Sequence, residues 1–446
     1  MPDFKDGWQC GNTNHRSNGL INLENAERPW NFAGALFPME EKELIPHLFK
    51  TEYRKIVSVL CKLFGIEHIE IAEDIVSDTF LLASETWGQK GLPKNPTAWL
   101  YTVSKNKTLD YLKHNKIFTE KIVDEIIHAQ TLSNEIEIDL SEKNIYDSQL
   151  QMMFAICNPI ISVQDQICLS LNILCGFGAD EIADAFLSNR QVIYKRLSRA
   201  KEKLRTEKVK IELPSQPEIS NRLETVLTTL YLLFSEGYYS TSQNTILRKD
   251  LCVEAIRLNI LLLENERTNT PETNALLSLM CFHSSRFEAR TNKNGDLILY
   301  QEQDESLWNK ELIQKGEYYL NQAARGKKLS KYHLEASIAY WHTHKADSPE
   351  KWESILQLYN RLLQIEYSPI AAMNRTYALA KANGVIEAII EAEKLNLRDN
   401  HFYFTLLGEL YNTVDKEKSK EHFLTALSLA KSLADKQTIK LKLDNL

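Results

Sequence analysis

Glycine and proline are scarce in this chain of 446 residues, which contains 15 glycines and 12 prolines. These are too few for the many tight turns of an all-β sandwich, whereas leucine, alanine, glutamate and lysine are abundant. Hydrophobic residues make up 43% of the chain and charged residues 25%, which is typical of globular proteins. We therefore predict an all-α fold, and the length predicts two or three folded units.

Long hydrophobic runs and paired cysteines are also missing. The apolar stretch 256–263 contains Arg257 and Asn259 and is much shorter than the roughly 20 residues of a membrane span. Seven cysteines form an odd set without a Cys-x-x-Cys pair, which favours reduced thiols and a cytoplasmic location. Residues 1–38 lack the pattern of a secretory signal and any helical periodicity, so we expect a poorly ordered segment, with Met39 as the true or an alternative start.

The formal net charge of -7 hides an uneven distribution, because two basic segments flank an acidic one. Helical periodicity and proline positions divide the chain into five parts. These are a poorly ordered segment 1–38, a helical module 39–118, an acidic linker 119–146, a second helical module 147–210 and a helical extension 211–446. In the first module we predict helices over 44–63, ended by Gly65, over 69–87, and over 98–115, capped by Asn95 or Thr97. The extension breaks near 265–271, 291–296, 346–349, 367–369 and 397–400, and 295–300 is a candidate β-hairpin or extended arm.

The second module shows the sharpest local pattern. A short helix over 181–186 has Ile182, Ala183 and Phe186 on one face, and Ser188 with Gln191 predicts a cap for a longer helix. We expect that helix to bury Val192, Leu197, Ala200 and Leu204. Its other face is basic and polar, with Arg190, Gln191, Tyr194, Lys195, Arg196, Arg199 and Lys203. This is the layout of a helix-turn-helix, whose second helix enters the major groove of duplex DNA; a solvated cationic helix on an ordinary bundle is the alternative.

The first module carries two further patterns. Its third helix interleaves aromatic and polar or charged side chains, at Trp99, Tyr101, Lys105, Asn106, Lys107, Asp110, Lys113 and Lys116. Aromatic faces stack on unpaired bases and cations follow the backbone, so the segment suits single-stranded DNA, although the aromatics would also fit a core. The second helix sets acidic residues around an apolar stripe, at Glu73, Asp74, Asp78 and Phe80, which suits docking to a helical partner or to its own bundle.

At this point the motifs resemble a known family. The segments Ala-Glu-Asp-Ile-Val-Ser-Asp-Thr-Phe (72–80), Asn-Pro-Thr-Ala-Trp-Leu-Tyr (95–101) and Glu-Ile-Ala (181–183) resemble regions 2 and 4 of bacterial RNA polymerase sigma factors. The resemblance is to the extracytoplasmic-function (ECF) subgroup of the sigma-70 family and covers about residues 40–206. The segments 230–238 and 254–258 resemble the C-terminal extension of a sigma subfamily with a tetratricopeptide-like tail. Asn158 departs from the Cys-His-Pro pattern of that subfamily.

The resemblance implies a transcription initiation factor, and we expect no enzymatic activity and no cofactor. By similarity, Glu73, Asp74, Asp78 and Phe80 would bind the β′ clamp helices of core RNA polymerase, and its β flap is a second expected contact. The residues of helix 98–116 would recognise and melt the −10 promoter element, and those of 190–203 would recognise the −35 element. The acidic linker would run through a basic channel of the polymerase. A regulatory protein or an intramolecular contact would use the C-terminal domain, and no membrane is involved.

The C-terminal half leaves other functions open. Tyr377 and Tyr411 lie 34 residues apart, as do Met373 and Leu407, which is the tetratricopeptide period. One alternative is a helix-turn-helix regulator that senses a ligand or protein through these repeats and works without polymerase. Another is an enzyme in the C-terminal half, for which the sequence shows no nucleophile, metal or phosphate-loop constellation.

Overall fold

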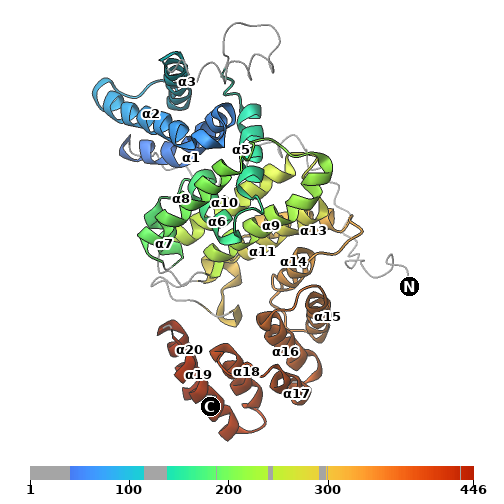
Figure 1. The fold of residues 1–446 in the computed structure, drawn as a ribbon. Coiled ribbons are helices and arrows are strands. Elements are labelled where there is room, and N and C mark those ends of the chain that lie inside the picture. The colour runs from blue at the N-terminus through green and yellow to red at the C-terminus, as the bar shows by residue number, and fades with distance from the viewer. Residues whose placement is uncertain are drawn as a thin grey trace. The chain divides into compact units, whose positions relative to one another are not determined.

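The computed structural model describes residues 41–114, 138–186, 188–239, 245–290, 298, 300–431 and 433–446. The segment 1–38 and most of the linker 119–146, which we predicted, lie outside the described residues. The described residues up to Leu446 belong to one compact unit that begins at Glu41, and no strand occurs among them (Figure 1). The predicted all-α fold is confirmed.

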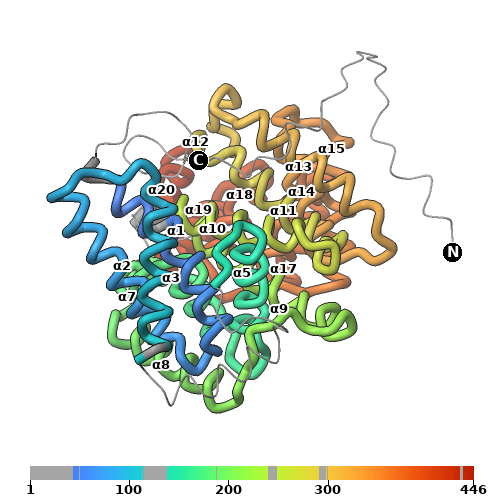
Figure 2. Tube along the Cα trace, turned by 90° about the horizontal axis from the view of Figure 1, so that it is seen from above, coloured from blue at the N-terminus to red at the C-terminus, as the bar shows by residue number. Residues whose placement is uncertain are grey.

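Three helices, α1 (Glu41–Phe64), α2 (Ile69–Lys90) and α3 (Pro96–His114), form the first module, and a 3-10 turn η2 (Ile66–His68) joins the first two. The three helices are neighbours in both views of the chain (Figures 1 and 2). Gly65 ends α1 with a φ of 89°, a conformation that glycine adopts without strain. The side chain of Asn95, rather than Thr97, caps α3, since its Oδ1 accepts a hydrogen bond from the Ala98 amide at 3.0 Å.

The second module consists of α5 (Glu142–Ile156), α6 (Val163–Leu169), the π-helical turn η3 (Ser170–Leu174), α7 (Ala179–Ala185) and α8 (Arg190–Thr206). Helix α5 therefore includes residues 142–146, which we had assigned to the linker. The turn between α5 and α6 uses Asn158, whose Oδ1 accepts a hydrogen bond from the Ile160 amide at 3.1 Å.

Two expectations for α8 were wrong by one residue. The cap is Asn189, whose Oδ1 accepts a hydrogen bond from the Gln191 amide at 2.7 Å, and not Ser188. The buried stripe begins at Ile193, which is 2% exposed, and Val192 is 47% exposed. Asn189 stops the backbone from becoming helical until residue 190, and the 3.6-residue period through Leu197 then selects Ile193.

The extension starts with α9 (Gln216–Tyr239), α10 (Thr245–Leu263), α11 (Pro271–Ser284) and the single turn α12 (Phe287–Arg290). Two 3-10 turns, η4 (Tyr300–Glu302) and η5 (Glu305–Leu307), lead to α13 (Lys310–Ala323) and α14 (Lys331–Trp341). The predicted hairpin 295–300 lies mostly outside the described residues, and Tyr300 itself begins η4.

The last six helices pack each on the next. They are α15 (Pro349–Ile365), α16 (Pro369–Asn383), α17 (Val385–Leu395), α18 (His401–Tyr411), α19 (Lys416–Leu429) and α20 (Leu433–Asp444). The pair Met373 and Leu407 lies in one apolar cluster, which also holds Tyr411. Gly408 allows α19 to approach α18, because a Cβ there would lie 2.9 Å from the Phe423 ring. The sequence missed several breaks in the extension, namely those between α9 and α10, α13 and α14, α16 and α17, α18 and α19, and α19 and α20. The break between α16 and α17 is at Gly384, whose φ is 103°.

Candidate nucleic-acid and polymerase interface

Helix α8 presents a basic face to solvent, and α7 lies beside it (Figures 1 and 2). Tyr194 is 68% exposed near its start, and Gln191, Lys195, Arg199 and Lys203 are exposed as well. Two of the predicted DNA-binding cations are held by acids of their own module. Arg190 lies 3.2 Å from Asp180 on α7, and Arg196 donates to Gln164 at 2.8 Å and lies 3.7 Å from Asp165. The other polar side chains of this face are exposed and lie outside these two ion pairs.

Helix α3 brings together the aromatic and charged residues predicted for the −10 element. Trp99 is half-buried, and its ring meets the Trp87 ring edge-on at 5.3 Å. The hydroxyl of Tyr101 donates to Glu52 at 2.5 Å; burial and then this hydrogen bond raise the pKa of Tyr101. The Trp99 ring is thus packed against α2, and the Tyr101 ring is fixed by its hydrogen bond to α1.

The polar residues of α3 lie along the helix beyond those rings. Asn106 and Asp110 are exposed, Lys105 is half-buried, and Lys107 lies 3.6 Å from Asp78 on α2. Lys113 belongs to α3, but its side chain is not described, and Lys116 lies outside the described residues. The structure therefore places seven of the eight predicted residues on α3, and describes the side chains of six of them.

Helix α2 carries the acids predicted to bind polymerase. Asp74 and Asp78 are exposed, whereas Phe80 is 5% exposed and packs against the Phe49 ring, with centroids 5.1 Å apart. Phe80 thus lies inside the module and supports the acidic face from beneath. A contact between Phe80 and a partner would require the ring to leave this packing.

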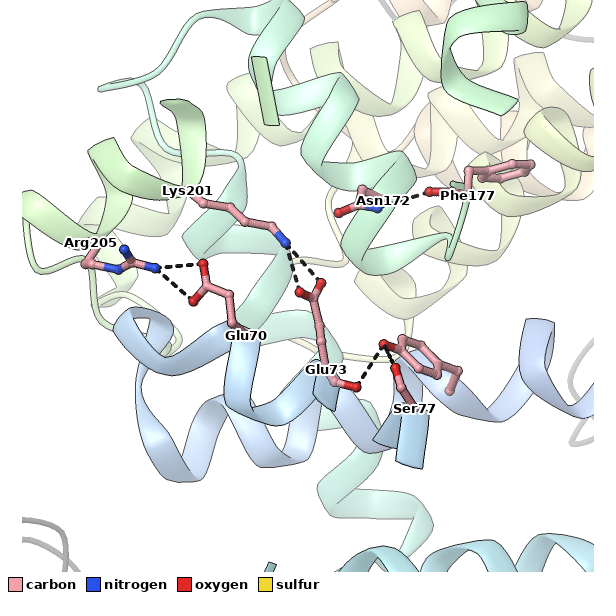
Figure 3. A network of polar contacts seen from close by, with 8 residues as sticks. Glu70, Glu73, Ser77, Asn172, Phe177, Lys201 and Arg205 are labelled. Carbon is pink, nitrogen blue, oxygen red and sulfur yellow. Dashed lines mark hydrogen bonds and ion pairs between the residues drawn. The ribbon is translucent and has the colours of Figure 1, made fainter. Parts of the chain in front are cut away.

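The remaining acid of that set, Glu73, contacts the second module (Figure 3). The Lys201 ammonium donates to both carboxylate oxygens of Glu73 at 3.0 Å. One turn away, Arg205 donates to both oxygens of Glu70, at 2.7 and 2.8 Å. On the α2 side, the Tyr53 hydroxyl donates to the Glu73 backbone carbonyl at 3.2 Å. We call these two ion pairs the α2–α8 contact; our sequence reading did not find them.

A buried ion cluster links the first module, the second module and the extension. The Arg54 guanidinium of α1 lies 2.6 Å from the Glu254 carboxylate of α10, and the Arg257 Nε donates to the same oxygen at 2.8 Å. Arg257 also donates to the Leu174 carbonyl of η3 at 2.8 Å. We call this group the Arg54 node. The Arg54 and Glu254 side chains are only 7% and 14% exposed, so water solvates neither charge well. Each charge is therefore stabilised mainly by the opposite charge beside it.

The electrostatics of the Arg54 node follow from its burial. Burial alone would raise the pKa of Glu254, but Arg257 and Arg54 outweigh it and hold the pKa below its usual value. Gly176 makes room for the node: its φ is 68°, and a Cβ there would lie 2.8 Å from the Arg54 Nε. A larger residue at 176 would push Arg54 away from Glu254.

The described residues also bear on metal binding, histidine burial and membrane spans. No group of three or more His, Cys, Asp or Glu side chains there could hold a metal ion. Among the histidines of the extension, His333 is buried and His344 is exposed. Burial lowers the pKa of His342 to about 3. None of the described helices is long and apolar enough to cross a membrane.

Comparison with known proteins identifies the first module. Residues 48–117, which run from α1 to just beyond α3, match the family described as sigma-70 region 2. This part of the chain is similar to sigma-70 region 2 domains. The match supports a sigma-70 family factor that binds core RNA polymerase and recognises promoters. The ordered α1–α3 bundle, with its acidic α2 face and aromatic α3, is the portion that this match covers.

Two further findings concern the rest of the chain. Residues 222–324, from α9 to the end of α13, match a family of unknown function (DUF6596). An uncharacterized protein of Rhizobium meliloti (strain 1021) is 30% identical over 385 residues, which is 85% of this chain and 90% of that protein. The chain belongs to one family with that protein. No solved structure matches the present chain.

Proposed function

We propose that the chain is a sigma factor of the ECF type, which binds core RNA polymerase and directs promoter recognition, DNA melting and transcription initiation. The observation that carries the proposal is the sigma-70 region 2 domain at 48–117 followed by the short helix α7, a tight turn and the exposed basic helix α8. Neither feature alone favours this function over the alternatives, and their order along one chain is what supports the proposal.

Each step of initiation has a surface in this proposal. The exposed acids Asp74 and Asp78 on α2 meet basic side chains of the β′ clamp helices. The rings of Trp99 and Tyr101, held in place by Trp87 and Glu52, stack on unpaired bases of the −10 element. Such stacking contributes about 1–3 kcal/mol per base. The exposed residues Gln191, Tyr194 and Lys195 near the start of α8 face base edges of the −35 element. The chain performs no catalysis; the polymerase does.

The C-terminal helices modulate this activity in our proposal, and the tetratricopeptide-like arrangement of α15–α20 would provide the surface for a regulatory protein. The Arg54 node supports a role coupled to the sigma modules, because Glu254 of the extension pairs with Arg54 of region 2. An intramolecular contact is therefore favoured over a freely tethered domain.

A second candidate is a helix-turn-helix regulator that binds duplex DNA without polymerase. The exposed α8 face favours it as much as it favours a sigma factor. The regulator function, however, leaves the match to sigma-70 region 2 unexplained.

Affinity for core RNA polymerase separates the two candidates. We would label the chain and measure its binding to purified core enzyme by fluorescence anisotropy, comparing the wild type with Asp74→Arg/Asp78→Arg. We expect about tenfold weaker binding by the double variant, because two acids that face a basic partner become repulsive. Glu85→Arg, which changes another exposed acid on the same helix, serves as the matched control and should bind like the wild type. Absence of core binding together with tight duplex binding would favour the regulator.

A further inference from the structure

A buried cluster of cations and aromatic rings lies in the extension. Arg286, between α11 and α12, is 9% exposed, and Lys351 of α15 is 2% exposed. The Arg286 guanidinium and the Lys351 ammonium each lie 5.4 Å from the centroid of the Tyr300 ring of η4. Trp308, which follows η5 and is 5% exposed, stacks on the same ring with centroids 6.1 Å apart. We call these four residues the Arg286 cluster.

The two cations of the cluster have no carboxylate partner among the residues that the structure describes. Arg286 donates to the Tyr238 hydroxyl at 3.4 Å. Lys351 donates to the His344 carbonyl at 2.5 Å and to the Tyr300 hydroxyl at 3.3 Å. These acceptors are all uncharged. Because a buried charge is unfavourable unless an opposite charge compensates it, the cluster carries an excess of positive charge.

The acids of this region do not remove the excess. Asp347 and Glu305 act to raise the pKa of Lys351, but both are exposed, and the Asp347 carboxylate lies 3.3 Å from the Lys381 ammonium. Burial outweighs the two acids and lowers the pKa of Lys351, and the charge of Arg286 adds to that shift. The positive potential at the cluster is therefore only partly offset by the protein itself.

The cluster also has hydrogen-bond donors to spare. The Nε of Arg286 and the Nε1 of Trp308 are buried, and neither has a hydrogen-bond partner among the described residues. An ammonium has three N–H groups, so Lys351 keeps a further donor beyond its two protein acceptors. Buried donors in folded proteins nearly always have a partner, which is either protein or a bound molecule. Positive charge and unused N–H donors together are what an oxyanion requires.

We propose that the Arg286 cluster binds a phosphate group, carried by inorganic phosphate or by a small phosphate monoester. Such a group carries nearly two negative charges at neutral pH and thus balances Arg286 and Lys351, whereas a carboxylate would leave one cation uncompensated. Its oxygens accept hydrogen bonds from Arg286, Trp308 and Lys351. The burial of these side chains favours a small molecule over a phosphorylated protein segment. The site belongs to the extension and does not depend on the proposed sigma function.

Isothermal titration calorimetry of the full chain with potassium phosphate tests the site, with potassium chloride at the same ionic strength as the reference. We expect saturable binding by the wild type and about tenfold weaker binding by Arg286→Lys, which keeps the charge but loses the Nε donor. Lys351→Met should weaken binding at least as much. Lys420→Met, which changes an exposed cation on α19, is the matched control and should bind like the wild type. Glycerol phosphate replaces inorganic phosphate in a second titration; tighter binding identifies a monoester as the ligand, weaker binding identifies the free ion, and both results support the site.

Thermal melts separate ligand binding from a purely structural role of Lys351. Phosphate should raise the melting temperature of the wild type and of Lys420→Met but not that of Lys351→Met, because a ligand stabilises only the state that binds it. Without phosphate, Lys351→Met should melt at or above the wild-type temperature, since one of two like buried charges is gone. A lower melting temperature of Lys351→Met with an undiminished response to phosphate would overturn the proposal. Absence of saturable binding of both inorganic phosphate and glycerol phosphate by the wild type would overturn it as well.

Discussion

Neutralising Glu254 tests the buried charges that connect the extension to region 2. Glu254→Gln keeps the shape of the side chain and one hydrogen-bond acceptor but removes the negative charge between two guanidinium groups. Arg54, whose side chain is 7% exposed, would then lie buried with only the Leu174 carbonyl at 3.5 Å as an acceptor besides the new amide. Breaking a buried ion pair by removing one partner costs about 3–5 kcal/mol. We expect a value near the lower limit, about 3 kcal/mol, because the Arg257 side chain is 32% exposed and water can solvate it.

The assay is urea unfolding followed by far-UV circular dichroism at pH 7.5. The control is Glu288→Gln, which breaks the exposed pair with Lys249 on the same domain, where the side chains are 68% and 43% exposed. Exposed pairs contribute about 0–1 kcal/mol. If Glu254→Gln destabilises the protein no more than Glu288→Gln does, the reasoning about the Arg54 node is refuted.

The pH dependence of this variant has a definite sign. The pKa of Glu254 is lower in the folded chain than in the unfolded one, where it is about 4.5. Its ionised form therefore stabilises the fold above that value, and this stabilisation is lost as the pH falls through the lowered pKa. The difference in stability between the wild type and Glu254→Gln should shrink below about pH 4, a trend that unfolding measurements over a pH series would detect.

Three other outcomes are expected. A chain that ends at Lys210 lacks Glu254 and the Thr229 hydroxyl that donates to Gln166 at 3.0 Å. It should therefore unfold at a lower urea concentration than the full chain and should lose transcription activity. A stable fragment with higher transcription activity would contradict this. Burial raises the pKa of Glu335 to about 7, above its unfolded value, so the wild type should lose stability as the pH rises from about 5 to 8, and Glu335→Gln should flatten that dependence in thermal melts. Lys203→Ala should reduce the salt slope of duplex −35 binding by about one, measured by anisotropy in a KCl series, whereas Lys420→Ala on α19 should leave the slope unchanged.

Local features of the sequence predicted most of the helices. Gly65 marks the end of α1 and Asn95 the start of α3, because chain reversal and capping depend on a few neighbouring residues. The face of α8 was predicted with an error of one residue, since Ser188 and Asn189 are both good caps and only the packed fold selects between them. A capping choice of this kind shifts the buried stripe without changing the helix.

Contacts between modules could not be predicted in this way. Lys201 and Glu73 are 128 residues apart, and Arg205 and Glu70 are 135 residues apart, so no local period connects them. In the sequence, Lys201 and Arg205 are two of several cations in a basic helix, and nothing distinguishes them as partners of α2. Arg54 and Glu254 are 200 residues apart as well, and the sequence analysis gave no indication that their side chains would be only 7% and 14% exposed.

Run-off transcription tests the central claim most directly. Purified core RNA polymerase and the full chain would be incubated with a promoter library, using the wild type, Trp99→Ala and Tyr194→Ala/Lys195→Ala, with melting curves to confirm that each variant folds. We predict transcripts from a defined set of promoters with the wild type, which share a −10 and a −35 sequence, and their loss in both variants. If core polymerase with the wild type yields no promoter-specific transcript, the central claim is contradicted and the chain is not a sigma factor.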